Sequence, residues 1–303
     1  MPLHGPILRE LDEIARQGSI RKAARVLNVT STSMNRRLIE AEEELGTQLF
    51  HRSPDGVELT EAGRIMVEHC RRALYDFARA RSEIDDMRAL RTGHLRIQSI
   101  DSLTFTLLPR AMVRFARANP GISLSMAVAL PKDITNDLLS GECDIGISFT
   151  KEVHPDLRAH AERPTPFGIV MRPDHPLAER TRVSIEDLRG FRLVRTMDAR
   201  GYTSIIDHEV SAAASTLTTT LFTNALMIAK QAILAGEAIG LYTKIGFVDE
   251  VAAGKLKFAQ LDVPALASYK IGMLTPAAQG ISPEKQLFIR AVETELRSVD
   301  LQN

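Results

Sequence analysis

One stretch, residues 18–50, constrains the fold of this chain more than any other, because it has the pattern of two helices joined by a tight turn. Ser19 stands where the cap of a first helix belongs, and Thr30 where the cap of a second helix belongs. Between them, Asn28 suits the left-handed backbone that ends a helix. Apolar residues recur at helical spacing in the second helix and form one stripe facing the first: Met34, Leu38, Ala41 and Leu45. The pattern predicts a helix-turn-helix.

The apolar stripe leaves polar side chains on the outward face of the second helix. They are Ser31, Thr32, Asn35, Arg36 and Arg37. Arginine can pair bidentately with guanine, asparagine with adenine, and serine or threonine with bases or phosphates. A helix presented in this way enters the major groove of DNA. We therefore take these residues, with Arg21 of the first helix, as candidate DNA-binding residues. A solvated helical hairpin would show a similar polar face.

The residues that follow favour the DNA-binding interpretation. Gly46 is placed to end the second helix, and residues 51–60 have the pattern of a two-stranded wing with a turn at Pro54–Gly56. Arg52 would lie on this wing, within reach of a phosphate. Apolar residues at helical spacing in residues 7–17 predict a third helix that completes the core of the unit. We expect a winged helix-turn-helix domain over residues 1–59.

At this point the sequence resembles the LysR-type transcriptional regulators, over the whole chain. The matching residues are Gly18-Ser19, Ala23-Ala24, Leu27, Glu42, Leu45-Gly46, Leu49-Phe50, Arg52, Leu59-Thr60 and Ala62-Gly63. Members of that family usually have Ser-Gln-Pro at the start of the recognition helix, where this chain has Thr30, Ser31 and Thr32. The resemblance implies a DNA-binding regulator, but the base preference of other members does not transfer to it.

The overall charge gives no support to DNA binding. The chain has 303 residues and a formal net charge of +0, and the acidic run Glu42–Glu44 offsets nearby cations. A DNA-binding role must therefore rest on the local arrangement of cations, with the acids turned away. The length suggests about two domains.

Several classes of protein are not expected from this sequence. There is no signal-peptide pattern and no apolar stretch that would span a membrane, so we expect a cytoplasmic protein. Cys70 and Cys143 stand far apart and suggest no disulfide or zinc site. No nucleophile elbow or phosphate-binding glycine loop occurs, so we expect no enzyme, catalytic residue or cofactor. His154 and His160 fall in a predicted loop, without further ligands at metal spacing.

A long helix is predicted over residues 60–92, as a linker. Its apolar residues alternate at steps of four and three, which is a heptad seam: Met66, Cys70, Ala73, Phe77, Ala80, Ile84 and Met87. A seam of this kind favours pairing with the same helix of a second subunit, although it could instead pack on its own domain. We expect a homodimer, and from it a tetramer, which would suit a protein that reads two half-sites.

From residue 93 to residue 303, strand patterns alternate with helix patterns, which predicts an α/β domain with a largely parallel sheet. We expect one lobe at about residues 93–165 and 266–303, and a second at about residues 166–265. This arrangement resembles the effector domain of the same regulator family and the two-lobed periplasmic binding proteins. The overall fold class is therefore α+β, with an N-terminal winged helix-turn-helix, a linker helix and a two-lobed α/β effector domain.

Ligands in open α/β sheets bind beyond the carboxyl ends of strands, near helix amino termini. Polar residues stand at such positions in both predicted lobes, and we take them as candidate effector-binding residues: Ser99, Asp101, Ser102, Thr196, Asp198 and Thr223. The hydroxyl groups could equally serve as helix caps. Asp101 would disfavour a simple anion and favour a ligand with an amine or hydroxyls, whereas the family resemblance implies a small organic effector, often an acid.

These observations predict a ligand-responsive, homo-oligomeric regulator of transcription that binds promoter DNA and a small organic effector. One alternative is a small-molecule-binding module with no sequence-specific DNA role. A second alternative is a regulator that senses no ligand and acts through assembly alone. Measuring thermal stability with and without ligand distinguishes this second alternative from the others. A ligand that binds only the native state must raise the stability of the protein, whereas a regulator that senses no ligand would show no such increase.

Overall fold

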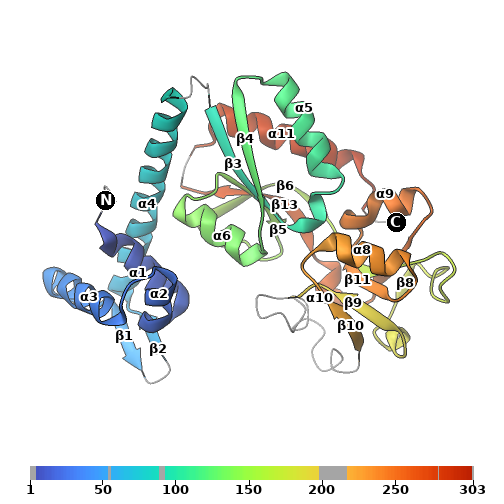
Figure 1. Ribbon diagram of the computed structural model, residues 1–303, viewed down its shortest axis with the longest axis horizontal. Coiled ribbons are helices and arrows are strands. Elements are labelled where there is room, and N and C mark those ends of the chain that lie inside the picture. Colours follow the sequence, from blue (N-terminus) through green and yellow to red (C-terminus); the bar gives the residue numbers. More distant parts are fainter. Residues whose placement is uncertain (1–4, 54–55, 89–92, 198–216, 279, 302–303) are drawn as a thin grey trace. The chain divides into compact units, whose positions relative to one another are not determined.

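The structure, a computed structural model, describes residues 5–53, 56–88, 93–197, 217–278 and 280–301. The chain forms two compact units, an N-terminal one that ends with a long helix and a larger C-terminal one (Figure 1). Among the described residues, no helix combines the length and apolar character needed to cross a membrane.

The N-terminal unit has the three helices and the two-stranded antiparallel wing that were predicted for it, followed by a long fourth helix. The elements are α1 (Pro6–Gln17), α2 (Ile20–Val26), α3 (Ser31–Leu45), β1 (Phe50–Ser53), β2 (Gly56–Leu59) and α4 (Glu61–Arg88). The Ser19 hydroxyl accepts a hydrogen bond from Lys22 N at 3.4 Å, and Thr30 caps α3 by accepting from Ser33 N at 3.2 Å. Asn28 (φ 53°) and Gly46 (φ 66°) adopt the left-handed backbone expected of helix ends. The tip of the wing, at residues 54–55, lies outside the described residues.

The core of this unit is apolar and continuous across all four helices. Its fully buried members include Leu11, Ile14, Met34, Leu38, Leu49, Phe50, Val67 and Cys70. The prediction that Leu45 belongs to the buried stripe is wrong, because it stands at the last turn of α3, beyond the end of the core, and is 46% exposed. Cys70 lies in this core, so the first turns of α4 pack on their own unit. Farther along, Ile84 is 52% exposed.

The C-terminal unit contains two sheets, one in each lobe. The first has the order β4 (Ile122–Val128), β3 (Gly93–Ser99), β5 (Ile145–Phe149), β13 (Lys270–Pro276) and β6 (Leu157–Pro164). The second has the order β10 (Thr218–Phe222), β9 (Arg192–Arg195), β11 (Ile239–Thr243), β7 (Phe167–Met171), β12 (Lys257–Leu261) and β8 (Arg182–Val183). The chain therefore leaves the first sheet after β6 and returns to it at β13.

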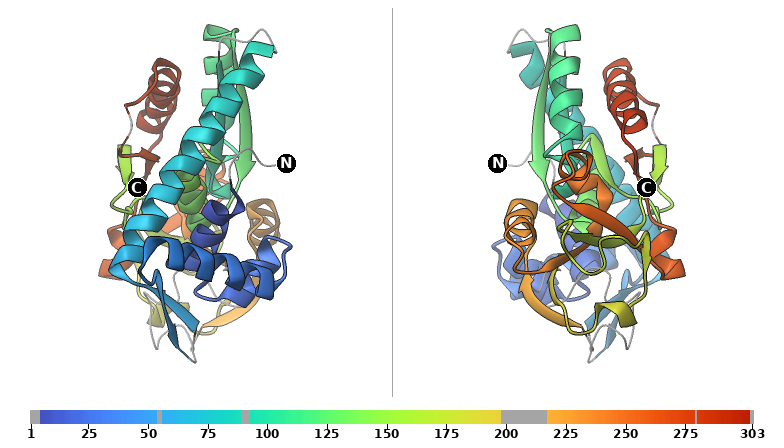
Figure 2. Two further views of the ribbon diagram at one scale, coloured as in Figure 1. Left: turned by 90° about the vertical axis from the view of Figure 1, so that its left-hand side faces the viewer. Right: turned by 90° about the vertical axis from the view of Figure 1, so that its right-hand side faces the viewer.

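Helices cover the two sheets. They are α5 (Leu107–Ala118), α6 (Pro131–Ser140) and α11 (Pro283–Ser298) in the first lobe, and α8 (Leu226–Leu234), α9 (Val248–Ala252) and α10 (Pro264–Ala267) in the second. Helices α5 and α11 lie side by side (Figure 2), and the rings of Phe115 and Phe288 meet edge to face with their centroids 5.3 Å apart. Two short 3-10 helices, η1 (Asp101–Leu103) and η4 (Lys244–Phe247), contact each other between the lobes.

Several details differ from the sequence-based expectations. Both sheets are mixed rather than largely parallel, because β13 runs antiparallel to β5 and β6, and β7 runs antiparallel to β11 and β12. His160 lies in strand β6 rather than in a loop, and its Nε2 is 2.9 Å from the Thr275 hydroxyl of β13. Strand β12 was not predicted either. The sequence from Ser204 onward has the pattern of a further helix, and this segment lies outside the described residues.

Candidate nucleic-acid interface and ligand cleft

None of the five candidate DNA-binding residues described on α3 is buried. Thr32 and Arg36 are exposed, and Ser31 and Asn35 are half-buried. The Arg36 side chain is 70% exposed, with its guanidinium 3.6 Å from the Glu40 carboxylate. An ion pair between such exposed groups is weak in water, so the Arg36 side chain is free to move to another acceptor.

Arg37, the fifth residue, is held by the protein itself. Its Nε donates to the Glu10 carboxylate at 2.7 Å, a second guanidinium nitrogen donates to the other Glu10 oxygen, and Nη1 donates to Ser33 Oγ at 3.0 Å. Glu10 is 2% exposed, so this pair joins α1 to α3 in a poorly solvated place. The geometry favours a role for Arg37 in positioning α3, and a base contact by Arg37 stays a prediction.

The wing is fastened to α3 through Glu42. Its Oε1 accepts hydrogen bonds from Leu49 N at 2.8 Å and Phe50 N at 3.2 Å, where β1 begins. Its other carboxylate oxygen lies 3.9 Å from the guanidinium of Arg52, whose side chain is 48% exposed. Glu42 thus turns inward, while Glu43 and Glu44 are exposed. Arg21, on α2, is also exposed.

A cleft of about 380 Å³ lies between the two lobes of the C-terminal unit. Its lining combines both lobes: Ile100, Asp101, Ser102, Val128, Ala129, Leu130, Pro131, Asp133, Phe149, Phe167, Thr196, Thr223, Asn224, Leu226, Tyr242 and Thr243. Four candidate effector-binding residues are therefore brought together, namely Asp101, Ser102, Thr196 and Thr223. The size suits a small organic molecule.

Two other candidates are not placed in this lining. Ser99 is fully buried, and its hydroxyl donates to the Ile100 carbonyl at 3.0 Å. Asp198 lies outside the described residues. The Thr223 hydroxyl lines the cleft but also accepts a hydrogen bond from Ala225 N at 3.0 Å, just before α8, so the capping alternative applies to it as well.

Asp101 connects the two lobes. It lies at the start of η1 in the first lobe, and its Oδ2 accepts a hydrogen bond from Leu226 N at 2.5 Å, at the first turn of α8 in the second lobe. Its Oδ1 accepts from the Thr104 hydroxyl at 3.2 Å. The carboxylate thus caps the amino terminus of α8, where a negative charge is favoured.

Sequence reasoning missed the aromatic residues of the cleft. Phe149 and Phe167 lie with ring centroids 5.5 Å apart. Tyr242 is 7% exposed, and its hydroxyl approaches the Thr196 side chain but has no hydrogen-bond partner among the residues that the structure describes. Phe149 and Tyr242 stand at the carboxyl ends of β5 and β11, so the strand-end rule that selected Thr196 would also have found them.

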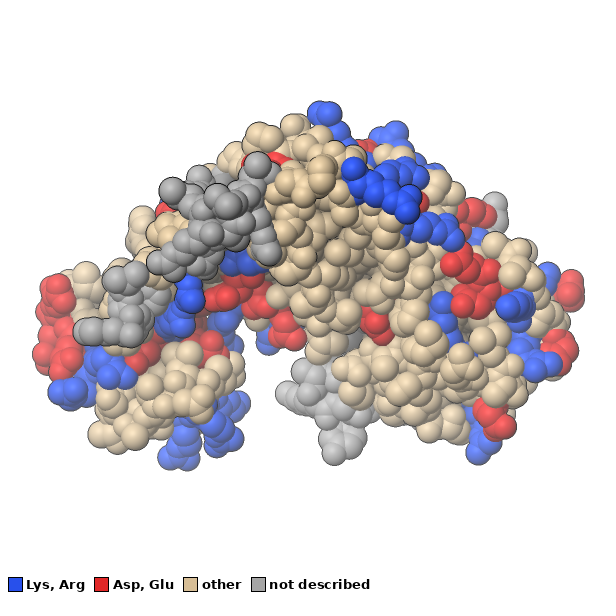
Figure 3. Space-filling view, turned by 45° about the horizontal axis from the view of Figure 1, so that its top comes forward, with Lys and Arg blue, Asp and Glu red and all other residues tan. Residues whose placement is uncertain are grey.

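Polar contacts also join the lobes beside the cleft. The Asp249 carboxylate of α9 accepts from the Thr106 hydroxyl at 2.8 Å and from Arg110 Nη2 at 3.1 Å. Arg110 belongs to a row on α5 with Arg114 and Arg117, and Lys and Arg side chains gather over this helix in Figure 3. The buried ammonium of Lys230 lies 2.8 Å from Glu250 and 5.0 Å from the centre of the Phe105 ring.

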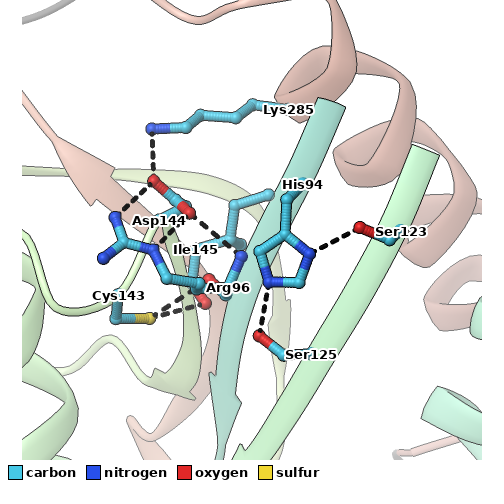
Figure 4. Close-up of polar contacts among 8 residues, drawn as sticks. All are labelled: His94, Arg96, Ser123, Ser125, Cys143, Asp144, Ile145 and Lys285. Atoms are coloured by element: carbon cyan, nitrogen blue, oxygen red, sulfur yellow. Dashed lines mark hydrogen bonds and ion pairs between the residues drawn. The ribbon is translucent and has the colours of Figure 1, made fainter. Parts of the chain in front are cut away.

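A charged cluster inside the first lobe is structural (Figure 4). The Asp144 carboxylate accepts from Arg96 N at 2.9 Å and Arg96 Nε at 3.0 Å, and lies 3.3 Å from Lys285 Nζ. Burial alone would raise the pKa of Asp144, but the hydrogen bonds from Arg96 and the charge of Lys285 outweigh it and lower the pKa. Burial raises the pKa of the neighbouring Cys143 thiol to about 12, so this thiol is not a nucleophile near neutral pH. The cluster ties β3, β5 and α11 together.

The chain combines a winged helix-turn-helix, a long helix and a two-lobed unit whose cleft has the size of a small molecule. This combination is typical of one class of protein, the ligand-responsive DNA-binding regulators. Residues 7–64 match the bacterial regulatory helix-turn-helix proteins of the lysR family, and residues 88–297 match the LysR substrate binding domain. The chain belongs to the LysR family of transcriptional regulators, and it is not an enzyme.

Relatives and solved structures agree with this assignment. The SDS degradation transcriptional activation protein of Pseudomonas sp. (strain ATCC 19151) is 27% identical over 287 residues, which cover 91% of each chain. A full-length OxyR variant from Pseudomonas aeruginosa has a TM-score of 0.56 at 19% identity, covering 98% of this chain and 96% of that one. Full-length CbnR in complex with its target DNA has a TM-score of 0.51 at 20% identity, covering 95% and 98%. These structures share the fold of this chain.

Proposed function

We propose that this regulator recognises its operator through the outward face of α3, with Asn35 and Arg36 as base-reading side chains, Ser31, Thr32 and Arg21 beside them, and Arg52 of the wing on a phosphate. The observation that supports this best is the difference between two neighbouring arginines of α3. Arg37 is hydrogen-bonded to Glu10, whereas the side chain of Arg36 is 70% exposed and can reach DNA. The CbnR complex supports DNA as the partner of this fold, without identifying the bases read here.

The proposal is tested by mobility shift of the full-length protein on the DNA just upstream of its own gene. The measurement is made at two salt concentrations, with random DNA as competitor. A specific shift that survives the competitor is the expected result. Binding no tighter than to random DNA at either salt concentration would mean that this DNA holds no operator or that α3 reads no sequence. Selection of binding sites from a random DNA library separates these two cases.

The roles of Asn35 and Arg52 differ in a measurable way. Asn35→Ala should weaken specific binding by about 1–3 kcal/mol, because one base contact is lost, and should leave binding to random DNA unchanged. Arg52→Ala should weaken binding to all sequences alike and flatten the dependence of log Kd on log salt by about one unit, because one phosphate contact is lost. The two variants serve as controls for each other. Equal losses on specific and random DNA for Asn35→Ala would remove it from the base-reading set.

We also propose that the effector binds in the interlobe cleft and changes how closely the lobes approach. The cleft is lined from both lobes, and Asp101, Thr106 and Arg110 already bridge them, so a ligand that prefers one arrangement shifts the balance between arrangements. In an oligomer this shift would alter the spacing or bend of bound DNA. DNA affinity, footprint and bending that all stay the same at saturating effector would refute this mechanism.

Pairing of subunits through α4 completes the proposal, with a homodimer as the basic assembly and a tetramer built from it. Ile84 of the heptad seam is 52% exposed in the single chain and would be covered by the partner helix in the proposed dimer. Ile84→Glu should therefore raise the dimer dissociation constant about 10-fold to 100-fold, because it would place a charge in that apolar contact. Ile65→Glu is a matched control, since Ile65 is 55% exposed on the same helix but lies outside the seam. Sedimentation at low protein concentration measures both. Equal effects of the two variants would contradict the seam.

The described elements support the boundaries expected for the domains, with the DNA-binding domain at residues 1–59, the linker helix at residues 60–92 and the effector domain at residues 93–303. Strand β2 ends at Leu59 and β3 begins at Gly93. We place the protein in the cytoplasm, where a regulator of transcription meets its DNA.

A further inference from the structure

The cleft carries negative charge and hydroxyl groups where a carboxylate ligand would need positive charge. We propose that the effector has an apolar, preferably aromatic, body and a head group that is either uncharged and hydroxylated or a protonated amine, rather than a carboxylate. This inference rests on the proposed function of the cleft as the effector site, and it names the chemical class of the ligand.

The first argument concerns the amino terminus of α8. In an α/β fold such a terminus is a natural site for an anion, because its free N–H groups and the helix dipole favour negative charge. In this protein the position is already taken, since Asp101 Oδ2 accepts the Leu226 N–H at 2.5 Å. A ligand carboxylate would compete with this internal carboxylate for the same donor and would be repelled by it.

The second argument concerns the remaining polar groups. Asp133, an exposed residue in the first turn of α6, adds a second carboxylate to the lining. The hydroxyls of Ser102, Thr196 and Thr243 can both donate and accept hydrogen bonds. Of the described residues that line the cleft, none is Arg, Lys or His. A protonated amine or a ligand hydroxyl therefore finds acceptors here, whereas a carboxylate finds no described cation to pair with.

The third argument is the buried hydroxyl of Tyr242. The side chain is 7% exposed and its oxygen has no hydrogen-bond partner among the described residues, which is unfavourable for a buried polar group unless a ligand or water completes it. Burial raises its pKa further above the ordinary value, so at neutral pH it is a neutral hydroxyl that donates or accepts. Phe149 and Phe167 belong to the same lining. A ligand with an apolar body and a polar head group could therefore contact these rings with its body and the Tyr242 hydroxyl with its head group.

The discrimination that follows is large enough to measure. Two like charges about 6 Å apart in a partly buried site, with an effective dielectric constant of about 20, change a binding constant by about 10-fold to 100-fold. The same electrostatic interaction is attractive for a protonated amine and strengthens its binding. Because Asp101 is half-buried, the cleft should bind an amine and an alcohol more tightly than a carboxylate that has the same body.

The test uses three probes that share one body: 3-phenylpropylamine, 3-phenylpropanol and 3-phenylpropanoate. Calorimetry on the full-length protein gives their dissociation constants. The chain has four tyrosines and no tryptophan, so incorporation of 3-fluorotyrosine yields few fluorine resonances, and Tyr242→Phe identifies the one from the cleft. The amine and the alcohol should bind at least 10-fold tighter than the carboxylate and should shift the Tyr242 resonance.

Asp101→Asn probes the charge without removing the acceptor for Leu226 N–H. It should weaken binding of the amine about 10-fold, strengthen binding of the carboxylate, and leave the alcohol within about two-fold of its wild-type affinity. Asp262→Asn is the matched control, because it removes the same charge from the effector domain at a side chain that is 63% exposed and not in the cleft. It should leave the ranking of the three probes unchanged.

The outcomes separate this inference from the proposed function. If the carboxylate binds tightest in the wild type and shifts the Tyr242 resonance, the inferred ligand class is overturned and the cleft remains the effector site. If none of the three probes shifts the Tyr242 resonance at millimolar concentration, the result counts against the cleft as a ligand site, and with it against this inference.

Discussion

Replacing Gly63 with alanine is expected to lower the free energy of unfolding of the N-terminal unit by about 3 kcal/mol or more, the upper range for overpacking. A Cβ atom at this position would lie 1.9 Å from the Leu49 carbonyl oxygen and 2.9 Å from its carbon. That carbonyl cannot swing away easily, because it accepts a hydrogen bond from Thr60 N at 3.0 Å. The first turn of α4 would therefore move away from the start of the wing, and DNA binding should be lost with it.

Gly46→Ala is the matched control for this prediction. Gly46 has a left-handed backbone (φ 66°), but a Cβ atom there would meet nothing within 4 Å. Alanine at Gly46 should therefore cost only about 1 kcal/mol, the backbone term alone. Hydrogen exchange of the α1 and α2 amides in the full-length protein reports the free energy of opening of this unit. Equal losses for the two variants would show that the Leu49 carbonyl yields to the added methyl group.

The second large effect is expected at Arg37. Arg37→Ala should lower the free energy of unfolding of the N-terminal unit by about 2–4 kcal/mol, because it leaves the Glu10 carboxylate buried without its partner. Glu10 is 2% exposed and accepts two hydrogen bonds from Arg37. Arg36→Ala, one residue away, removes a 70% exposed side chain and should change the free energy of unfolding by no more than about 0.5 kcal/mol.

A double variant tests the cause of this destabilisation. Glu10→Leu together with Arg37→Leu removes both charges, and should recover much of the stability lost in Arg37→Ala, because no unpaired charge stays buried. The same proteins report on DNA binding. If Arg37→Ala keeps wild-type stability but loses only specific binding, Arg37 reads a base, as the sequence suggested. Loss of stability with equal losses on specific and random DNA would mark it as a residue that positions α3.

The parts of the fold that were predicted correctly depend on short-range interactions. The caps at Ser19 and Thr30 bond to backbone groups three residues away, and Asn28 and Gly46 end their helices through their own backbone conformation. Such interactions depend only on residues that are close together in the sequence, so they can be predicted from it. The mixed strand directions could not be read in the same way, because the pairing of β13 with β5 and β6 joins segments more than a hundred residues apart.

The same distinction between local and long-range interactions applies to the candidate site. The amino-acid sequence by itself determined the helix-turn-helix, the outward face of α3, the family, and the strand ends that supply Asp101, Ser102, Thr196 and Thr223 to the cleft. Only the tertiary structure decided which of these groups are free to bind. It paired Arg37 with Glu10 across 27 residues and placed Asp101 on the amino terminus of α8 across 125 residues. It also buried the Tyr242 hydroxyl without a hydrogen-bond partner in the described part of the chain. The physical reason is that hydrogen bonding and desolvation depend on neighbours in space, whereas helix caps and hydrophobic periodicity depend on neighbours in the chain.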